Sequence, residues 1–556
     1  MWVDIADDLT GLLVQDYLRH AVVSKVYKPQ VVDYSLITIR QVLYILFFCL
    51  RSIQIGAHLV VNMSYVTETV HAEERSVPLL GAQLLTLSIT VVTGGELTTN
   101  DNVKLDIKTL RDQIPAHCFK PSTLYSLFWV FRDSAILAGL VYGAFWVDRN
   151  SNPYVSALTR YVLYPYAAGI AMTGLWVLAH EAGHGAFSTN KTVADTVGFI
   201  IHSALMSPYF AWRSSHGRHH QFANNVSIDL NYVPPSREEY RTMFGGRSTP
   251  EKTVPEKVHE HEHGHEHTMS DNFEDAPLVV FWRIVLQQVI GWHWYLLSHI
   301  TAGPNSGKYP TSEALDNIVS VPTLTYFESP KKSRGWWDNS HFMPNSSLFR
   351  SDEFWDILLS DVGLLSMAGL VYNLGKIYGF TTMLWAYGLP LMWVNHWIVM
   401  ITYLHHTHTE LPKYTPESWT YLRGALATVD RDPGFIMRHM THHIIDLHVV
   451  HHLFPRVPHY HAQEATDAMK PLLGEYYHSD KTSYWGALWH AFTKCQWVEP
   501  DPAKTLKANV YGSGKGDDAA EVARRKAIDE QGVLWYRSGK MPLPVVRMRS
   551  SDHLSV

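Results

Sequence analysis

The chain has 556 residues, of which 46% are hydrophobic, 12% aromatic and only 18% charged. This composition is typical of a protein that lies partly in lipid, but a mean hydropathy of -0.10 argues against a membrane bundle with minimal loops. A net charge of -6 offers no basic surface, so we expect no nucleic-acid partner. Cys49, Cys118 and Cys495 are widely separated, which predicts neither a disulfide framework nor a thiolate metal site.

We assign residues 1–95 to an N-terminal extension outside the main domain. The first residues lack a basic segment followed by an apolar core, so we expect no cleavable signal peptide. Leu36–Val61 is apolar but interrupted by two arginines, which favours an interfacial or core helix over an extra membrane span. A polar stretch begins at Met63, so it stays open whether residues 1–62 belong to the working protein.

Four apolar stretches predict helices that cross a membrane. Residues 127–147 and 161–179 form one predicted helical hairpin, and residues 357–375 and 377–404 form a second. Because the second hairpin crosses twice, the polar segments on either side of it return to the same membrane face. The predicted fold is therefore an all-α integral membrane protein, a four-helix transmembrane bundle of two hairpins with interfacial helices and a histidine-rich cap.

Two further apolar segments, residues 193–212 and 277–300, contain histidine, proline or arginine and are predicted to lie along the membrane surface. Between them is a polar insert, residues 236–275, in which histidine and glutamate alternate over residues 259–267. We interpret this insert as a solvated loop, with metal buffering or transport as the alternative.

The segments after the last span are predicted to be water-soluble. A short helix is expected at Ala462–Lys470, ended by Pro471. A glycine-rich stretch then leads into a charged terminus, so we assign residues 506–556 to a cytosolic C-terminal tail and residues 96–505 to the main domain.

Three histidine clusters stand beside the predicted spans. On a helix, positions i, i+3 and i+4 lie within an arc of about 100°, so each cluster can direct its imidazoles into one space. Eight imidazoles exceed the four ligands that a structural zinc ion uses, which favours two metal ions. The clusters are His180-Glu181-Ala182-Gly183-His184, His216-Gly217-Arg218-His219-His220 and His448-Val449-Val450-His451-His452.

Ligand type alone does not select the metal, because neutral imidazole binds iron, zinc, copper and nickel. The first cluster also matches the zinc metallopeptidase pattern, in which His180 and His184 would hold zinc and Glu181 would activate water. An intramembrane zinc metallopeptidase is thus the alternative from another class, but it leaves the other two clusters unexplained. The number of imidazoles and their position beside the bilayer favour redox-active iron.

The three clusters, in this order and spacing, resemble those of the membrane fatty acid desaturase family. The surrounding sequence is similar to that of the acyl-lipid delta-12/omega-3 branch of this family, and Phe454–Tyr460 resembles the corresponding segment of fungal members. The likeness extends over about residues 100 to 505, and its further segments are Ile114–Phe119, Gly291-Trp292, Leu359–Leu364, Ile401–Leu404, Arg423–Arg431 and His451–Pro455. One departure is Ala182, where this branch commonly has cysteine, so the first cluster gives little information on regioselectivity.

The resemblance implies a cytosolic di-iron cap in which the eight cluster histidines are catalytic and bind two iron ions, with O2 as co-substrate. It also implies a further ligand at the end of the last span, where we choose His406 ahead of His408 and His405. The implied iron ligands are His180, His184, His216, His219, His220, His406, His448, His451 and His452. The side chains expected to orient them are Glu181, Asp229, Asp446, His442 and His408.

The activity implied is insertion of a cis double bond into an acyl chain of a phospholipid in the endoplasmic reticulum membrane, with oleate to linoleate (delta-12) favoured. The chain has no His-Pro-Gly-Gly haem motif, so cytochrome b5 and NADH-cytochrome b5 reductase are the expected electron donors. On the same fold, omega-3 or bifunctional delta-12/omega-3 desaturation and a diverged hydroxylase, acetylenase or epoxygenase remain alternatives.

Overall fold

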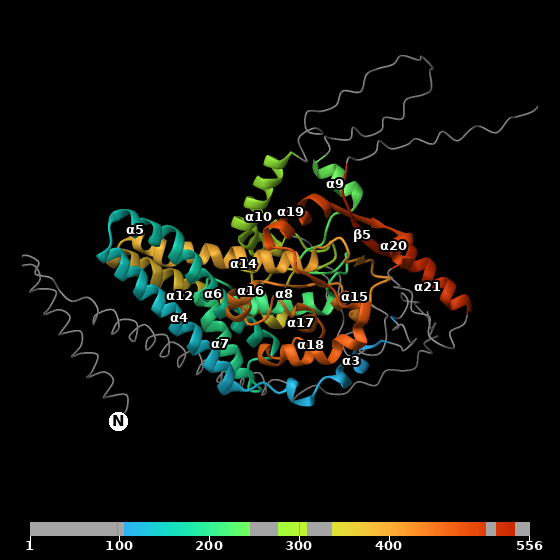
Figure 1. Cartoon of the computed structure of the whole chain (residues 1–556), viewed down its shortest axis with the longest axis horizontal. Helices are drawn as coiled ribbons and strands as arrows, with labels where there is room; N and C mark the ends of the chain where they lie inside the picture. The colour runs from blue at the N-terminus through green and yellow to red at the C-terminus, as the bar shows by residue number, and fades with distance from the viewer. Residues whose placement is uncertain are drawn as a thin grey trace, which may run out of the picture. The chain divides into compact units, whose positions relative to one another are not determined.

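The computed structural model describes residues 97, 105–244, 276–299, 301–307, 336–507 and 519–539, which all belong to one unit of the chain, residues 88–556 (Figure 1). The predictions for residues 1–95 and for the His-Glu core of the insert fall outside the described residues.

The first hairpin consists of two long helices. Helix α4, Thr123–Asn150, begins where the Ser122 side chain accepts a hydrogen bond from the amide of Tyr125. The second helix runs without a break from Pro153 to His184, so the first histidine cluster forms its last two turns. Its three parts are α5 (Pro153–Leu158), the π-helical turn η2 (Thr159–Leu163) and α6 (Tyr164–His184).

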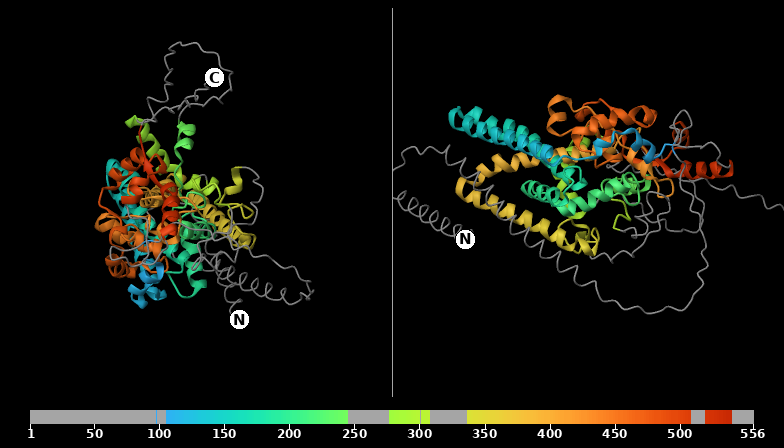
Figure 2. Two further views of the ribbon diagram at one scale, coloured as in Figure 1. Left: turned by 90° about the vertical axis from the view of Figure 1, so that its right-hand side faces the viewer. Right: turned by 90° about the horizontal axis from the view of Figure 1, so that it is seen from below.

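The second hairpin turns at Gly379, whose φ of 90° is a conformation that favours glycine. Its first arm is η5 (Ser351–Glu353) and α12 (Phe354–Tyr378). Its second arm is α13 (Phe380–Met383), the π-helical turn η6 (Leu384–Gly388) and α14 (Leu389–His406). The turns of both hairpins lie at the same end of the molecule (Figure 2, right).

Four helices in the described part of the chain are long and apolar enough to cross a membrane, as predicted. The predicted start of the last span at residue 377 is wrong, because the chain turns only at Gly379. Helix α6 is the central one: it packs against α4 and α14 and is mostly buried. A Cβ at Gly169 would lie 2.3 Å from Cβ of Trp393, so glycine is needed for the close approach of α6 and α14.

The two segments predicted to lie at the membrane surface are not among the candidate spans. Residues 193–212 contribute to two helices. They divide near Pro208, which lacks an amide donor, into α7 (Lys191–Ala204) and the start of α8 (Tyr209–Phe222). Helix α10, Pro277–Ser298, packs against α14 and leaves Trp282, Leu286 and other apolar side chains exposed.

Short helices form the cap. Helix α18 continues through Pro471 to Leu473, so the predicted helix end is wrong: near the end of the helix, Pro471 removes only its own amide hydrogen bond and two more residues follow it. The cap elements are α3 (Ile107–Gln113), η1 (Ala116–Phe119), α9 (Arg237–Phe244), η4 (Trp336–Asn339), α15 (Tyr421–Leu426), α16 (Gly434–Met440), α17 (His448–Leu453), α18 (His459–Leu473), η7 (Gly474–Tyr476), α19 (Tyr484–Lys494), α20 (Pro502–Lys507) and α21 (Ala519–Gly532).

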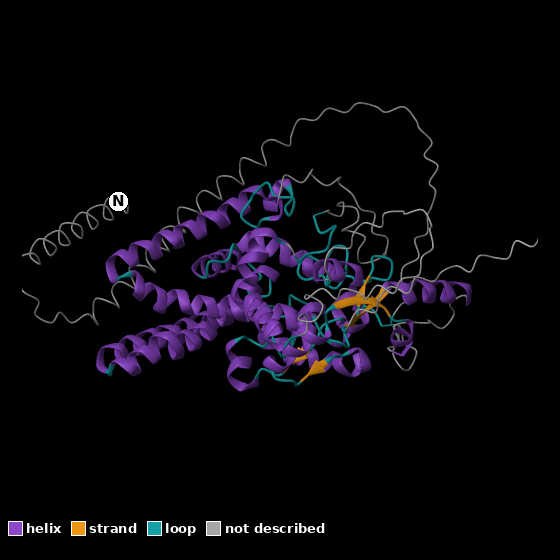
Figure 3. Ribbon diagram, turned by 90° about the horizontal axis from the view of Figure 1, so that it is seen from above, coloured by secondary structure: helices purple, strands orange, loops and turns teal. Residues whose placement is uncertain are grey.

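Two small sheets lie away from the turns of the two hairpins (Figure 3). In the larger sheet, β5 (Val533–Arg537) pairs antiparallel with both β1 (Lys413–Tyr414) and β4 (Trp497–Pro500). In the smaller, β2 (Asp430–Arg431) pairs parallel with β3 (Ser479–Asp480). The segment predicted as a tail, residues 506–556, therefore contributes a strand to the cap.

Candidate metal centre

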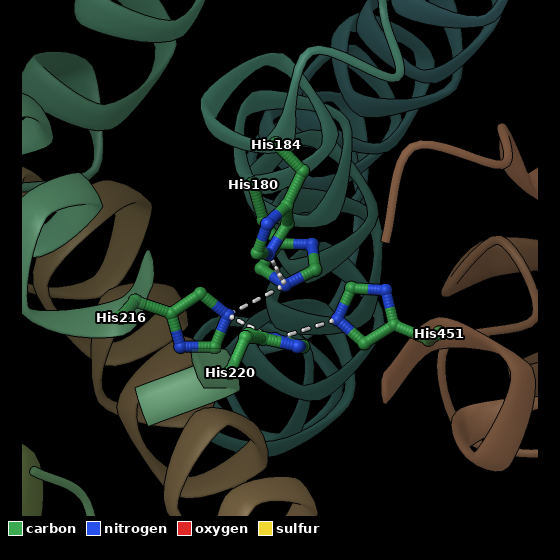
Figure 4. Close-up of side chains that lie close together, drawn as sticks. All are labelled: His180, His184, His216, His220 and His451. Carbon is green, nitrogen blue, oxygen red and sulfur yellow. Dashed lines mark hydrogen bonds between the residues drawn. The ribbon is translucent and has the colours of Figure 1, made fainter. Parts of the chain in front are cut away.

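Five histidines from three helices converge on one point. His180 and His184 come from the end of α6, His216 and His220 from α8, and His451 from α17 (Figure 4). Their ligand atoms lie within 4.8 Å of one another. We call this set the first histidine group.

A second histidine group lies beside the first. His219, His406 and His452 bring ligand atoms within the same 4.8 Å limit, and all three are buried. The ring of His448 lies 4.7 Å from that of His452 and 5.4 Å from that of His406. Its Nδ1 faces the carbonyl oxygen of Ile444 at 3.0 Å, which leaves a buried Nε2 with no hydrogen-bond partner among the described residues.

The two His-x-x-His-His clusters divide between the groups in opposite ways. From α8, the first and last histidines join the first group and the middle one, His219, joins the second. From α17, the middle histidine, His451, joins the first group, whereas His448 and His452 lie with the second. The groups meet where the rings of His220 and His452 stack with centroids 4.2 Å apart. Each repeat therefore contributes to both groups.

The Nε2 atoms of the first group lie close enough together to bind one cation. Nε2 of His216 lies 3.0 Å from Nε2 of His180 and 3.1 Å from Nε2 of His220, and the latter lies 3.1 Å from Nε2 of His451. Each imidazole Nε2 offers either one N–H or one lone pair, so the Nε2 atoms of His216 and His220, which each make two of these contacts, can satisfy only one of them as a normal hydrogen bond. A metal ion accepts several lone pairs at once, and the nine histidines are therefore compatible with a metal centre.

Burial keeps these imidazoles neutral. Loss of solvent, followed by the nearby imidazoles, holds the pKa of His216, His220 and His451 well below the ordinary value of 6.5. The same causes act in the second group, where the pKa values of His448 and His452 are also well below 6.5. Neutral imidazole is the form that binds a metal.

One predicted carboxylate orients a histidine of the centre. Asp229 Oδ1 accepts a hydrogen bond from Nδ1 of His219 at 2.7 Å, and both side chains are buried. This contact directs Nε2 of His219 toward His406, 3.3 Å away. Asp229 is fixed in turn by the backbone amides of Asn224 and Asn231, which donate to its two oxygens.

Glu181 does not contact a histidine of either group. Its carboxylate accepts from the backbone amide of His459 at 2.6 Å and from Nδ1 of the same residue at 2.8 Å. A metallopeptidase glutamate must reach the metal-bound water, so this pairing removes the reason for the peptidase alternative. Glu181 instead fastens α18 to α6.

His442 and Asp446 also have other partners than the predicted ligands. His442 Nε2 donates to Oδ2 of Asp133, a buried carboxylate in the first span, at 2.7 Å. Burial lowers the pKa of His442 to about 4, so the ring is neutral. Asp446 accepts from Nδ1 of His443 at 2.9 Å and pairs with Arg438. The bond between His442 and Asp133 holds the loop before α17 against the first hairpin, and the pair between Asp446 and Arg438 holds the same loop against α16.

The three histidines at the end of the last span differ in what their nitrogen atoms contact. His406 lies in the second group. His405 has Nδ1 2.6 Å from the carbonyl oxygen of Ile401 and Nε2 2.9 Å from that of Ile445, so neither nitrogen is directed at the centre. His408 is half-buried and its nearest charged group is Asp480, 3.9 Å away.

The sequence did not identify His459 as the partner of Glu181, or Asp133 as the partner of His442. Asp133 carried a usable signal, because an ionisable residue inside a predicted span normally has a buried partner. His459 carried none, since it is one histidine among 33 in the chain.

The fold and the site together define an integral membrane protein whose cap encloses clustered, neutral histidines at the end of its spans. The chain matches the description of the fatty acid desaturase family over residues 158–306 and 258–484. It belongs to this family and is an oxidoreductase.

Several characterised proteins are similar to the chain over most of its length. An oleate hydroxylase of Claviceps purpurea is 38% identical over 74% of this chain and 79% of its own. A delta(12) fatty acid desaturase of Mortierella isabellina is 36% identical over 71% of this chain and 88% of its own. An omega-6 fatty acid desaturase of Glycine max, named as an endoplasmic reticulum isozyme, is 32% identical over 79% and 92%, respectively.

Proposed function

We propose that this protein is an acyl-lipid desaturase whose two histidine groups bind two iron ions. The first group would supply five imidazoles to one iron, and His219, His406, His448 and His452 would supply four to the other. The observation that carries the proposal is the convergence of nine histidines, six of them buried, on two adjacent sites at the end of two membrane hairpins.

Iron in this centre would supply the reduction of O2 and the oxidation of an unactivated C–H bond, chemistry that zinc lacks. The protein's own part is positioning. It keeps the imidazoles neutral by burial and places them at the end of two hairpins whose outer helices, α4 and α12, expose many apolar side chains. An acyl chain dissolved in the bilayer can then reach the centre without crossing water.

The favoured reaction is the conversion of an oleoyl chain in a phospholipid to a linoleoyl chain. O2, two electrons and two protons are consumed, two hydrogens leave the acyl chain, and two molecules of water form. The likeness to the Mortierella enzyme supports delta-12 desaturation. Hydroxylation of oleate is the second candidate, because a protein of that activity is 38% identical to this chain.

The electron donors in this proposal are cytochrome b5 and NADH-cytochrome b5 reductase, since the chain contains no haem-binding His-Pro-Gly-Gly motif of its own. The location is the endoplasmic reticulum membrane, with the histidine cap on the cytosolic side. The likeness to an endoplasmic reticulum isozyme of Glycine max supports this location.

Expression in a yeast that makes only monounsaturated fatty acids tests the proposal. Mass spectrometry of the lipids should show linoleate, and a 12-hydroxy acid in its place would assign the protein to the second candidate. His451→Ala should abolish the product, whereas His439→Ala, which removes an exposed histidine of α16, should retain it. Absence of either product despite membrane insertion and a supplied electron donor would contradict the proposal.

A further inference from the structure

A further cluster of side chains that could bind a metal ion lies outside both histidine groups. It joins η1, which precedes the first span, to α18, which follows the third histidine cluster. One ligand atom from each of four residues lies within 4.8 Å of the others. We call this set the junction cluster, and its members are His117, Cys118, His461 and Glu464.

We propose that the junction cluster is a binding site for a zinc ion. One thiol, two imidazoles and one carboxylate are the ligand types that zinc takes, and four is the number that it uses in structural sites. Calcium and magnesium are disfavoured because they select oxygen ligands. This inference is independent of the proposed desaturase activity, since it involves none of the nine histidines.

The local geometry is already close to that of a closed site. Nε2 of His117 lies 2.8 Å from Oε2 of Glu464, and Nδ1 of His461 lies 3.8 Å from the same oxygen. His461 and Glu464 are three residues apart on α18 and therefore share one face of the helix. Ligands around tetrahedral zinc are about 3.4 to 3.7 Å apart, so the His117–Glu464 pair would open slightly and the wider pairs would contract as the site closes around the ion.

The surroundings allow an ion to enter and to be held. Cys118 is fully buried, whereas the side chains of His117 and Glu464 are 56% and 47% exposed and form the open side. Burial raises the pKa of the Cys118 thiol to about 11, so binding of zinc would have to displace its proton. A zinc site here departs from the prediction of no thiolate site, which sequence spacing alone could not test because more than 340 residues separate the two halves of the cluster.

Zinc at this position would fasten the segment before the first span to α18. That helix also carries His459, which donates to Glu181 in the first histidine cluster. Packing between Phe119 and Phe454, with ring centroids 5.7 Å apart, holds the same junction without an ion. Variants of the cluster are therefore expected to fold.

Cobalt(II) titration of the full-length protein in nanodiscs tests the proposal, because only a thiolate ligand gives a near-ultraviolet thiolate-to-cobalt charge-transfer band. The nine histidines include no thiolate, so cobalt bound there gives no such band. We expect the band to saturate at one cobalt per chain, to disappear on addition of zinc, and to be absent in Cys118→Ser. In the matched control Cys495→Ser, which changes a buried cysteine outside the cluster, the band should remain.

A second variant guards against an effect of Cys118→Ser on folding. His461→Gln changes a partly exposed side chain and should weaken cobalt binding by more than about 100-fold, the upper end for loss of a group that only orients a ligand. Zinc should also raise the thermal midpoint of the unmodified protein and not that of Cys118→Ser. No thiolate band at saturating cobalt, or a band that persists in Cys118→Ser, would overturn the proposal.

Discussion

His219 donates a hydrogen bond from Nδ1 to Oδ1 of Asp229 across 2.7 Å, while its Nε2 faces Nε2 of His406 at 3.3 Å. One ring thus links a loop carboxylate to the end of the last span. Because the carboxylate fixes both the tautomer and the orientation of the ring, the second histidine group depends on a residue that binds no metal.

Asp229→Asn should lower the affinity of the second group for iron by about 10- to 100-fold, because an amide orients the imidazole less strongly than a carboxylate does. Iron binding to the purified protein measures the effect. Asp446→Asn is the matched control: its carboxylate contacts His443 and Arg438, so iron affinity should not change. Equal losses in the two variants would show that Asp229 has no orienting role.

His406→Ala and His405→Ala should separate a ligand from its structural neighbour. Loss of His406 removes one imidazole from the second group, so we expect its iron and the activity to be lost. Loss of His405 removes the one N–H that its neutral ring can donate to the carbonyl oxygen of Ile401 or of Ile445, which costs about 1 to 3 kcal/mol of stability but retains both irons. Iron analysis that gives the reverse order would assign the ligand to His405.

The buried ion pair between Arg423 and Asp529 should stabilise the cap. Both side chains are fully buried, and two parallel contacts of 2.8 and 2.9 Å join them. Arg423→Ala removes the cation of this buried ion pair, so we expect a loss of about 3 to 5 kcal/mol in the free energy of unfolding.

Thermal unfolding of the detergent-solubilised protein measures this loss. The double variant Arg423→Ala/Asp529→Ala should lose less stability than the sum of the losses in the two single variants, because both single substitutions remove the same ion pair. Lys108→Ala, which removes the exposed pair with Asp112, should leave the thermal midpoint almost unchanged. Strict additivity of the two single variants would contradict the predicted coupling.

Lys413 should make stability depend on pH in the alkaline range. Burial lowers the pKa of its ammonium group from 10.5 to about 8, and Nζ donates to Oδ1 of Asn224. Between pH 8 and 10.5 the unfolded chain binds this proton and the folded chain releases it, so stability rises with pH in that window. The full effect is about 3 kcal/mol.

Lys413→Met should abolish that rise, because methionine has a similar length and no charge. Thermal midpoints between pH 7.5 and 10 compare the two proteins. Equal slopes would mean that Lys413 is charged in the folded protein throughout this range.

The spans and the convergence of the histidines could be predicted because both follow from local patterns. An uncharged run of about 20 residues crosses a bilayer whatever its neighbours are. The spacing of His216, His219 and His220 places all three on one face of a helix. What this spacing cannot reveal is that His219 serves a different group from the other two, since that depends on how α8 and α17 pack.

The partners of Glu181 and His442 could not be predicted, because they lie 278 and 309 residues away in the sequence. Of the carboxylates chosen for nearness in sequence, Asp229 on the loop just after α8 contacts a cluster histidine, whereas Glu181 and Asp446 contact His459 and His443. The role of each in orienting a ligand stays a prediction. Strand β5 was missed for a different reason. Its partners β1 and β4 have two and four residues, which is too short for a period-two pattern to be recognised.

The binding of two iron ions by the two histidine groups is tested by the iron content of the purified, catalytically active protein. We predict two irons per chain, with reduced iron content in both His451→Ala and His406→Ala, which change one proposed ligand of each group. One metal ion per chain that is unaffected by either substitution would contradict it.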